Sequence, residues 1–161
     1  MKIGNKRKRR MTEFTIREYG INGVLLTILF LLGLFLSWKR SWFAGLLYLV
    51  FWAASYAVLY AMTCRNCTNY GKSCPVPFEG SCVQRFFGRG EKFGVMAGLG
   101  AVLAYFLRVC IPYTAIFLMG SMLDFILYTG LFAGFFYVLL YHTGCPNCVN
   151  VRCPFNPDFG T

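Results

Sequence analysis

The hydrophobic positions of this chain gather into four long segments separated by short polar ones. The segments cover residues 21–38, 42–62, about 93–119 and 123–141. Each is close to the ~20 apolar residues that an α-helix needs to cross the hydrocarbon core of a bilayer. The pattern therefore predicts an all-α integral membrane protein with four transmembrane helices.

Composition supports this class. Of the 161 residues, 57% are hydrophobic and 14% are charged, and the mean hydropathy is +0.54. Such values are wrong for a soluble domain of this length. The first segment is too long for a signal peptide and is followed by Lys39 and Arg40 rather than by a cleavage site, so we expect it to be a retained helix.

The basic residues predict the orientation in the membrane. Thirteen of them lie in the N-terminal segment, in the loop between the second and third helices, or in the C-terminal tail. The connection between the first and second helices carries two, Lys39 and Arg40. Cations near helix ends stay preferentially in the cytoplasm. We therefore expect a multi-pass protein of the cell membrane with cytoplasmic N- and C-termini, in contact with membrane lipids. The net charge of +10 then needs no nucleic acid to explain it.

The chain also looks duplicated. Shifted by 81 positions, LYAMTCRNCTN (59–69) lies over LYHTGCPNCVN (140–150), and with a gap of two Cys74-Pro75 lies over Cys153-Pro154. We predict two tandem helix-hairpin repeats, each followed by a cytoplasmic cysteine knuckle: a basic N-terminal segment (1–20), repeat 1 (21–82), a connection (83–101) and repeat 2 (102–161). Both repeats run in the same direction, so a pseudo-two-fold axis along the membrane normal would bring the knuckles together.

Seven of the eight cysteines lie at the predicted cytoplasmic surface, while Cys110 lies inside the third apolar segment and reads as a small buried side chain. Two residues between thiols let a tight turn aim both sulfurs at one ion, so C-x2-C recurs in zinc and iron–sulfur sites. The predicted metal ligands are Cys64, Cys67, Cys74, Cys82, Cys145, Cys148 and Cys153.

Three chemistries remain open for these thiols. An iron–sulfur cluster is favoured, with one four-cysteine set in the loop (64, 67, 74, 82) and three ligands of another in the tail (145, 148, 153). Structural zinc is the alternative, held by one C-x2-C pair from each knuckle, 64 and 67 with 145 and 148. Thiol–disulfide exchange is the third, although the cytoplasm keeps thiols reduced.

Arg108 lies near the middle of the third apolar segment. A central Arg costs at least ~2.5 kcal/mol on insertion scales, so it should face the bundle interior or a partner. Its own chain offers little to pair with, because Asp124 begins the fourth helix at the opposite surface. We expect Arg108, with Tyr60 and Tyr141 near the cysteine face, to bind a cofactor such as a quinone. The alternatives are that Arg108 snorkels to the membrane surface or pairs with another subunit.

These features predict a metal-binding, iron–sulfur electron-transfer subunit that links a soluble redox partner on the cytoplasmic face to the membrane or its quinones. The first alternative is a zinc-binding membrane adaptor or scaffold, and the second alternative is a membrane thiol–disulfide oxidoreductase. With six acidic residues the chain has little acid–base equipment, so any enzymatic role is that of a subunit of an oxidoreductase complex. Homo- or hetero-oligomerisation is also expected, because another subunit could supply a partner for Arg108.

Overall fold

The structure is a computed structural model that describes residues 13–91, 93–153, 156 and 158. Over these residues it is helical and contains no β-strand. The long helices are α1 (Ile16–Arg40), α2 (Trp42–Val58), α4 (Val95–Met119) and α5 (Met122–Tyr137), and a short helix, α3 (Glu79–Cys82), lies in the central loop. The prediction of an all-α chain is confirmed.

The four long helices are apolar and long enough to cross a membrane. The apolar helical stretches, including the turns that continue α2 and α5, run for 22, 25, 25 and 26 residues. At 1.5 Å per residue even the shortest reaches roughly 33 Å, against a hydrocarbon core of ~30 Å. Large apolar side chains such as Val50, Phe106 and Ile126 are exposed on their outer faces, where lipid would cover them. The four spans predicted from hydropathy are confirmed by length and composition.

Serine caps begin the second helix of each hairpin. Ser41 Oγ accepts a hydrogen bond from the backbone N–H of Ala44 at 3.1 Å, and Ser121 Oγ accepts one from Asp124 at 3.3 Å. A side-chain cap satisfies one of the N–H groups that the first helical turn leaves without a partner. Gly120, with φ of 66°, ends α4 in the left-handed region, which glycine adopts without strain. Both connections are therefore very short.

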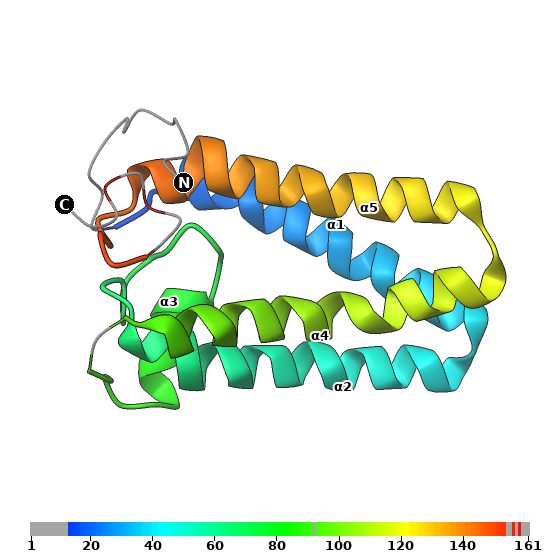
Figure 1. Cartoon of the computed structure of the whole chain (residues 1–161), viewed down its shortest axis with the longest axis horizontal. Helices are drawn as coiled ribbons and strands as arrows, with labels where there is room; N and C mark the ends of the chain where they lie inside the picture. The colour runs from blue at the N-terminus through cyan, green and yellow to red at the C-terminus, as the bar shows by residue number, and fades with distance from the viewer. Residues whose placement is uncertain (1–12, 92, 154–155, 157, 159–161) are drawn as a thin grey trace.

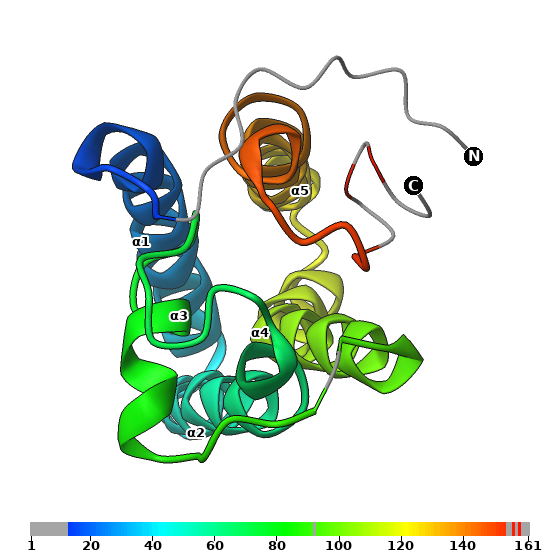
Figure 2. The same cartoon turned by 90° about the vertical axis from the view of Figure 1, so that its left-hand side faces the viewer.

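The helices form a four-membered bundle in the ring order α1–α2–α4–α5, with α1 and α4 also in contact across the middle (Figure 2). Figure 1 shows the two short connections at one end of the bundle. The start of α1, the central loop and the C-terminal tail lie together at the other end, which we call the cysteine end. The basic residues at 2–10 and Lys92 lie outside the described residues, so the cytoplasmic orientation of this end stays a prediction.

Packing joins the central loop to both hairpins at the cysteine end. Asn22 of α1 is fully buried, and its Nδ2 donates to the Pro75 carbonyl and to Thr143 Oγ1, each at 2.8 Å. The backbone N–H of Phe14 donates to the Ser73 carbonyl at 3.3 Å. Buried amides are retained where their hydrogen bonds are satisfied. The loop is therefore held against α1 and the end of α5.

Candidate functional site

The two cysteine-containing segments that follow α2 and α5 (59–82 and 138–153), for which we keep the name knuckles, begin with the same succession of turns. Beyond α2 a π-helical turn (Leu59–Thr63) leads into a 3₁₀ turn (Cys64–Asn66). Beyond α5 a π-helical turn (Val138–Thr143) leads into a 3₁₀ turn (Cys145–Asn147). The 3₁₀ turns coincide with the two C-x2-C motifs. The local structure thus follows the sequence similarity between the two segments.

Corresponding side chains make corresponding hydrogen bonds in the two knuckles. Asn66 Nδ2 donates to the Met62 carbonyl at 2.8 Å, four residues back, and Asn147 Nδ2 donates to the Thr143 carbonyl at 3.1 Å with the same spacing. In each C-x2-C motif the backbone N–H of the second cysteine donates to the carbonyl of the first, at 3.2 Å and 3.4 Å. The amides close both turns and fix how the paired thiols project.

The two knuckles also contact each other reciprocally. Asn69 Nδ2 donates to Cys148 Sγ at 3.9 Å, and Asn150 Nδ2 donates to Cys67 Sγ at 3.7 Å. The backbone N–H of Asn150 is 3.4 Å from Cys148 Sγ. Asn69 and Asn150 are both buried. The structure therefore brings the central loop and the tail into contact, whereas the sharing of a centre by their thiols stays a prediction.

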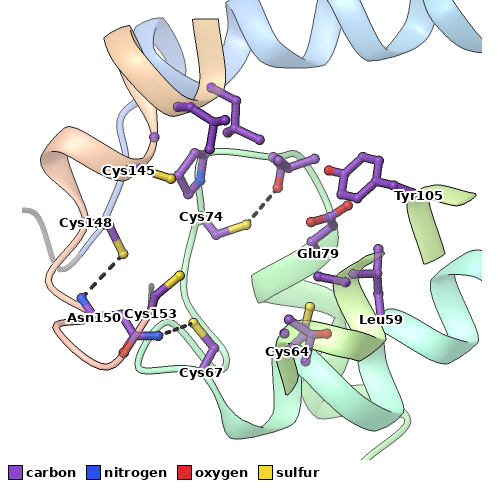
Figure 3. Close-up of a pocket in the computed structure, with 18 of the residues that line it drawn as sticks. Leu59, Cys64, Cys67, Cys74, Glu79, Tyr105, Cys145, Cys148, Asn150 and Cys153 are labelled. Carbon is purple, nitrogen blue, oxygen red and sulfur yellow. Dashed lines mark hydrogen bonds between the residues drawn. The ribbon is translucent and has the colours of Figure 1, made fainter. Parts of the chain in front are cut away.

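Thiols from both knuckles line one cavity of about 600 Å³ at the cysteine end. In the view of Figure 3, Cys74 and Cys145 lie above Cys67 and Cys153. Of the seven predicted ligands, Cys82 does not line the cavity; it packs beside Leu59 and Tyr60 instead. The six that do are Cys64, Cys67, Cys74, Cys145, Cys148 and Cys153.

The cysteines share the cavity without converging on a point. Among the described residues, no three His, Cys, Asp or Glu side chains are placed so that they could hold a metal ion. Cys64, Cys67, Cys74 and Cys145 are free thiols, and Cys74 Sγ lies 2.9 Å from the Val76 carbonyl, to which it donates. A bound metal would need the loop and tail thiols to move toward each other. The predicted ligand sets therefore stay predictions.

Below the thiols the cavity wall is apolar. It runs along α4 and α5 and includes Phe106, Val109, Phe132 and Phe136. Tyr105 bridges the two helices, with its ring centroid 5.0 Å from that of Phe136. A cavity of this size, mostly apolar with a few polar groups at one end, is typical of small-molecule sites.

Glu79 is the carboxylate of this cavity, and it forms a buried ion pair with Arg108. Glu79 Oε1 is 3.1 Å from Arg108 Nη1, and Arg108 Nε donates to Ser55 Oγ at 2.9 Å. The Arg108 side chain is fully buried. The expectation that the chain itself lacks an acidic partner for Arg108 is wrong, because the central loop folds back against the bundle and inserts Glu79 beside α4.

Three aromatic rings complete the surroundings of Arg108. Its guanidinium carbon lies 5.1 Å from the ring centroid of Trp52, 4.6 Å from that of Tyr56 and 4.8 Å from that of Tyr105. Cation–π contacts stabilise a cation most strongly where water is excluded. Arg108 Nη2 has no hydrogen-bond partner among the described residues. Arg108 is thus held rigidly behind Glu79 rather than facing lipid.

The electrostatics of the loop follow from this burial. Burial raises the pKa of the Glu79 carboxyl, and the Arg108 guanidinium acts in the opposite direction. Burial, and then the neighbouring Glu79 carboxylate, raise the pKa of the Cys74 thiol well above its ordinary value. A thiol with a raised pKa is a poor nucleophile, because the thiolate is the reactive form.

The structure does not bring the three predicted cofactor-binding residues to the cavity itself. Arg108 reaches it only through Glu79. Tyr60 Oη donates to the Phe78 carbonyl at 2.9 Å, and Tyr141 is exposed at the helix end. The aromatic wall is built instead by Tyr105 and its neighbours. The predicted roles of Tyr60 and Tyr141 rest on their distance from the cysteine end, whereas helix rotation decides which side chains line the cavity. Tyr60 is buried, but it packs in a separate cluster with Leu59.

Comparisons of the chain with protein-family models, curated proteins and solved structures find no match. The thiol-lined cavity and the Glu79–Arg108 pair are therefore the features from which a function is inferred.

Proposed function

We propose that this protein is an electron-transfer subunit of the membrane, with an iron–sulfur centre held jointly by the two cysteine knuckles. It passes electrons between a soluble partner at the cysteine end and an apolar carrier, such as a quinone, within the bilayer. The observation that carries this proposal is that six cysteines from both knuckles line one cavity, which continues between α4 and α5.

The surroundings of the thiols favour metal ligation. Iron–sulfur clusters are bound by cysteine thiolates, and hydrogen bonds to the sulfurs tune their potential. Asn69 and Asn150 supply such bonds from the opposite knuckle, at 3.9 Å and 3.7 Å. The shared cavity favours one centre held by both knuckles over one centre in each, with Cys82 not among its ligands.

Duplication of one unit explains how the knuckles come to face each other. The serine caps, the π-helical turns, the 3₁₀ cysteine turns and the asparagine hydrogen bonds recur in both halves. Two such hairpins related by a pseudo-two-fold axis would place equivalent residues opposite one another. The reciprocal contacts of Asn69 with Cys148 and of Asn150 with Cys67 have this form.

A structural zinc site is the second candidate, and the reciprocal knuckle contacts favour it. An ion at that position would join the loop to the tail, as zinc does in paired knuckles, and the protein would then serve as a membrane adaptor. Thiol–disulfide exchange has less support, because a reactive cysteine needs a lowered pKa, whereas burial raises that of Cys74.

The position in the cell follows from the distribution of cations. We propose that the cysteine end faces the cytoplasm. The described basic residues outside the four long helices all lie in the central loop or the tail, and cations near helix ends stay preferentially in the cytoplasm. The soluble electron donor or acceptor then docks at this end. The chain would act as a subunit of an oxidoreductase complex, in which it is present as one copy or as an oligomer.

Anaerobic purification in detergent, followed by an absorbance spectrum and by iron, sulfide and zinc analysis of the same sample, tests the proposal. Iron with sulfide and a broad band near ~400 nm that dithionite bleaches are expected. Colourless protein with bound zinc would refute the electron-transfer proposal and support the zinc-binding adaptor. Metal-free protein would refute both proposals.

Two cysteine variants refine this experiment. Cys148→Ser removes a thiol of the shared cavity and is expected to lose most of the iron and colour. Cys82→Ser is the matched control, because Cys82 lies outside the cavity, and it is expected to keep both. Equal iron loss in the two variants would instead support separate centres in the two knuckles.

A further inference from the structure

The cavity below the thiols opens toward the membrane between α4 and α5. Val102 and Phe106 line it from α4, yet they are 64% and 60% exposed. Side chains that belong both to a cavity and to the outer surface mark its mouth. Since α4 is long and apolar enough to cross a membrane, that mouth would face lipid. A ligand would therefore enter from the bilayer, and its body must be apolar.

The polar end of the cavity offers a fixed hydrogen-bond acceptor. Glu79 lines the cavity and is only 7% exposed, and its Oε1 is held at 3.1 Å by Arg108. Figure 3 shows its carboxylate beside the hydroxyl of Tyr105, on the side of Cys74. Arg108 is in turn fixed by Ser55 and by three rings. The acceptor is thus rigid and lies close to the thiols.

We propose that this cavity binds a hydroquinone, with one hydroxyl donating to the Glu79 carboxylate and the ring between α4 and α5. The tail of the ligand leaves through the mouth at Val102. A carboxylate only accepts hydrogen bonds, so it favours the reduced form, which has hydroxyl donors, over the quinone. It also repels phosphate, which makes a phospholipid headgroup a poor occupant. The redox role of such a ligand rests on the proposed function, whereas its binding does not.

Binding can be measured with decylubiquinol and decylubiquinone on the full-length protein in lipid nanodiscs, by isothermal titration under argon. The quinol is expected to bind at least about tenfold more tightly than the quinone, the difference that a hydrogen bond to a charged group typically makes. Glu79→Gln should remove most of this preference. Equal affinities of the wild-type protein for the two forms would overturn the role of Glu79, and absence of saturable binding would overturn the site.

A pair of tryptophan variants tests the cavity without disturbing the ion pair. Val102→Trp narrows the mouth and is expected to weaken binding of both forms at least tenfold. Leu103→Trp is the control, because the neighbouring Leu103 is exposed on α4 and does not line the cavity. Equal affinities for the two variants would refute entry at this position.

Iron and sulfide analysis of the same samples separates this inference from the proposed function. Selective quinol binding to iron-free protein would support the site and contradict the electron-transfer proposal. An intact iron–sulfur centre in protein that does not bind the quinol would refute the site and leave the proposed function in place.

Discussion

Removing the Arg108 guanidinium should be the most damaging single change in the membrane-spanning part of the bundle. Arg108→Met leaves the Glu79 carboxylate buried without its partner at 3.1 Å, and it also removes the hydrogen bond to Ser55 and the contacts with three rings. Loss of one member of a buried ion pair typically destabilises by about 3–5 kcal/mol. In a chain of this size ~3 kcal/mol corresponds to about 6–12 °C in Tm.

The assay is thermal unfolding in detergent, followed by tryptophan fluorescence. Arg108→Met combined with Glu79→Gln should recover at least half of the lost Tm, because no buried charge remains. Lys39→Met is the control: it removes an exposed pair with Asp124 at 3.4 Å, and exposed pairs contribute little, so the Tm should stay nearly constant. A double variant as unstable as Arg108→Met would refute the argument from unpaired charge.

The loss of Tm in the Arg108→Met variant should depend on pH. Burial raises the pKa of Glu79 even with Arg108 present, and loss of the guanidinium raises it further. A carboxyl whose pKa is higher in the folded than in the unfolded state stabilises the protein at low pH, and this contribution is lost as the pH rises through the folded-state pKa. The Tm deficit of Arg108→Met should therefore shrink between pH 7 and pH 5. A constant deficit would show that lost packing, rather than charge, is responsible.

Two further predictions concern the knuckles and the helix contacts. Asn69→Leu and Asn150→Leu remove the hydrogen bonds to Cys148 and Cys67. Both should lower the midpoint potential of the proposed centre in a dye-mediated redox titration, because such bonds stabilise its reduced form. Asn66→Leu is the control, because the Asn66 amide donates to a carbonyl, and it should leave the potential unchanged. Gly100→Ala should lower the Tm by several degrees because its Cβ would collide with Met62, whereas Gly98→Ala meets no atom within 4 Å and should be neutral.

The helices were predictable because hydropathy alone decides which segments can enter a bilayer. The observed α2, with its π-helical turn, ends at Thr63 where the apolar pattern indicated Met62, and α4 ends at the predicted Met119. The approach of the two knuckles was likewise indicated by the repeated C-x-N-C motifs. Such features are local in sequence, or follow from counting how often the chain crosses the membrane.

The partner of Arg108 was not predictable in the same way. Glu79 lies in a loop, and nothing in its own position fixes how far that loop folds back along α4. One signal was available: Glu79 is surrounded by Val76, Phe78 and Gly80 rather than by charged residues, and Val76 and Gly80 are buried. That Tyr60 and Tyr141 lie outside the cavity lining could not be read from their distance to the cysteines, because the rotation of each helix depends on the packing of the whole bundle.

The π-helical turns that end α2 and α5 also bear on how this chain tolerates length changes. Each residue of an α-helix turns the following chain by about 100°, and a π-helical turn accommodates one extra residue within the helix. Deleting a residue from Leu59–Thr63 or from Val138–Thr143 would therefore leave the lipid-facing surface of the helix intact while swinging the following thiols away from the cavity. The extra residue in each π-helical turn thus sets the rotation of the following cysteine segment relative to the helix. The lipid-facing surface of each hairpin and the direction of its cysteines can therefore change independently.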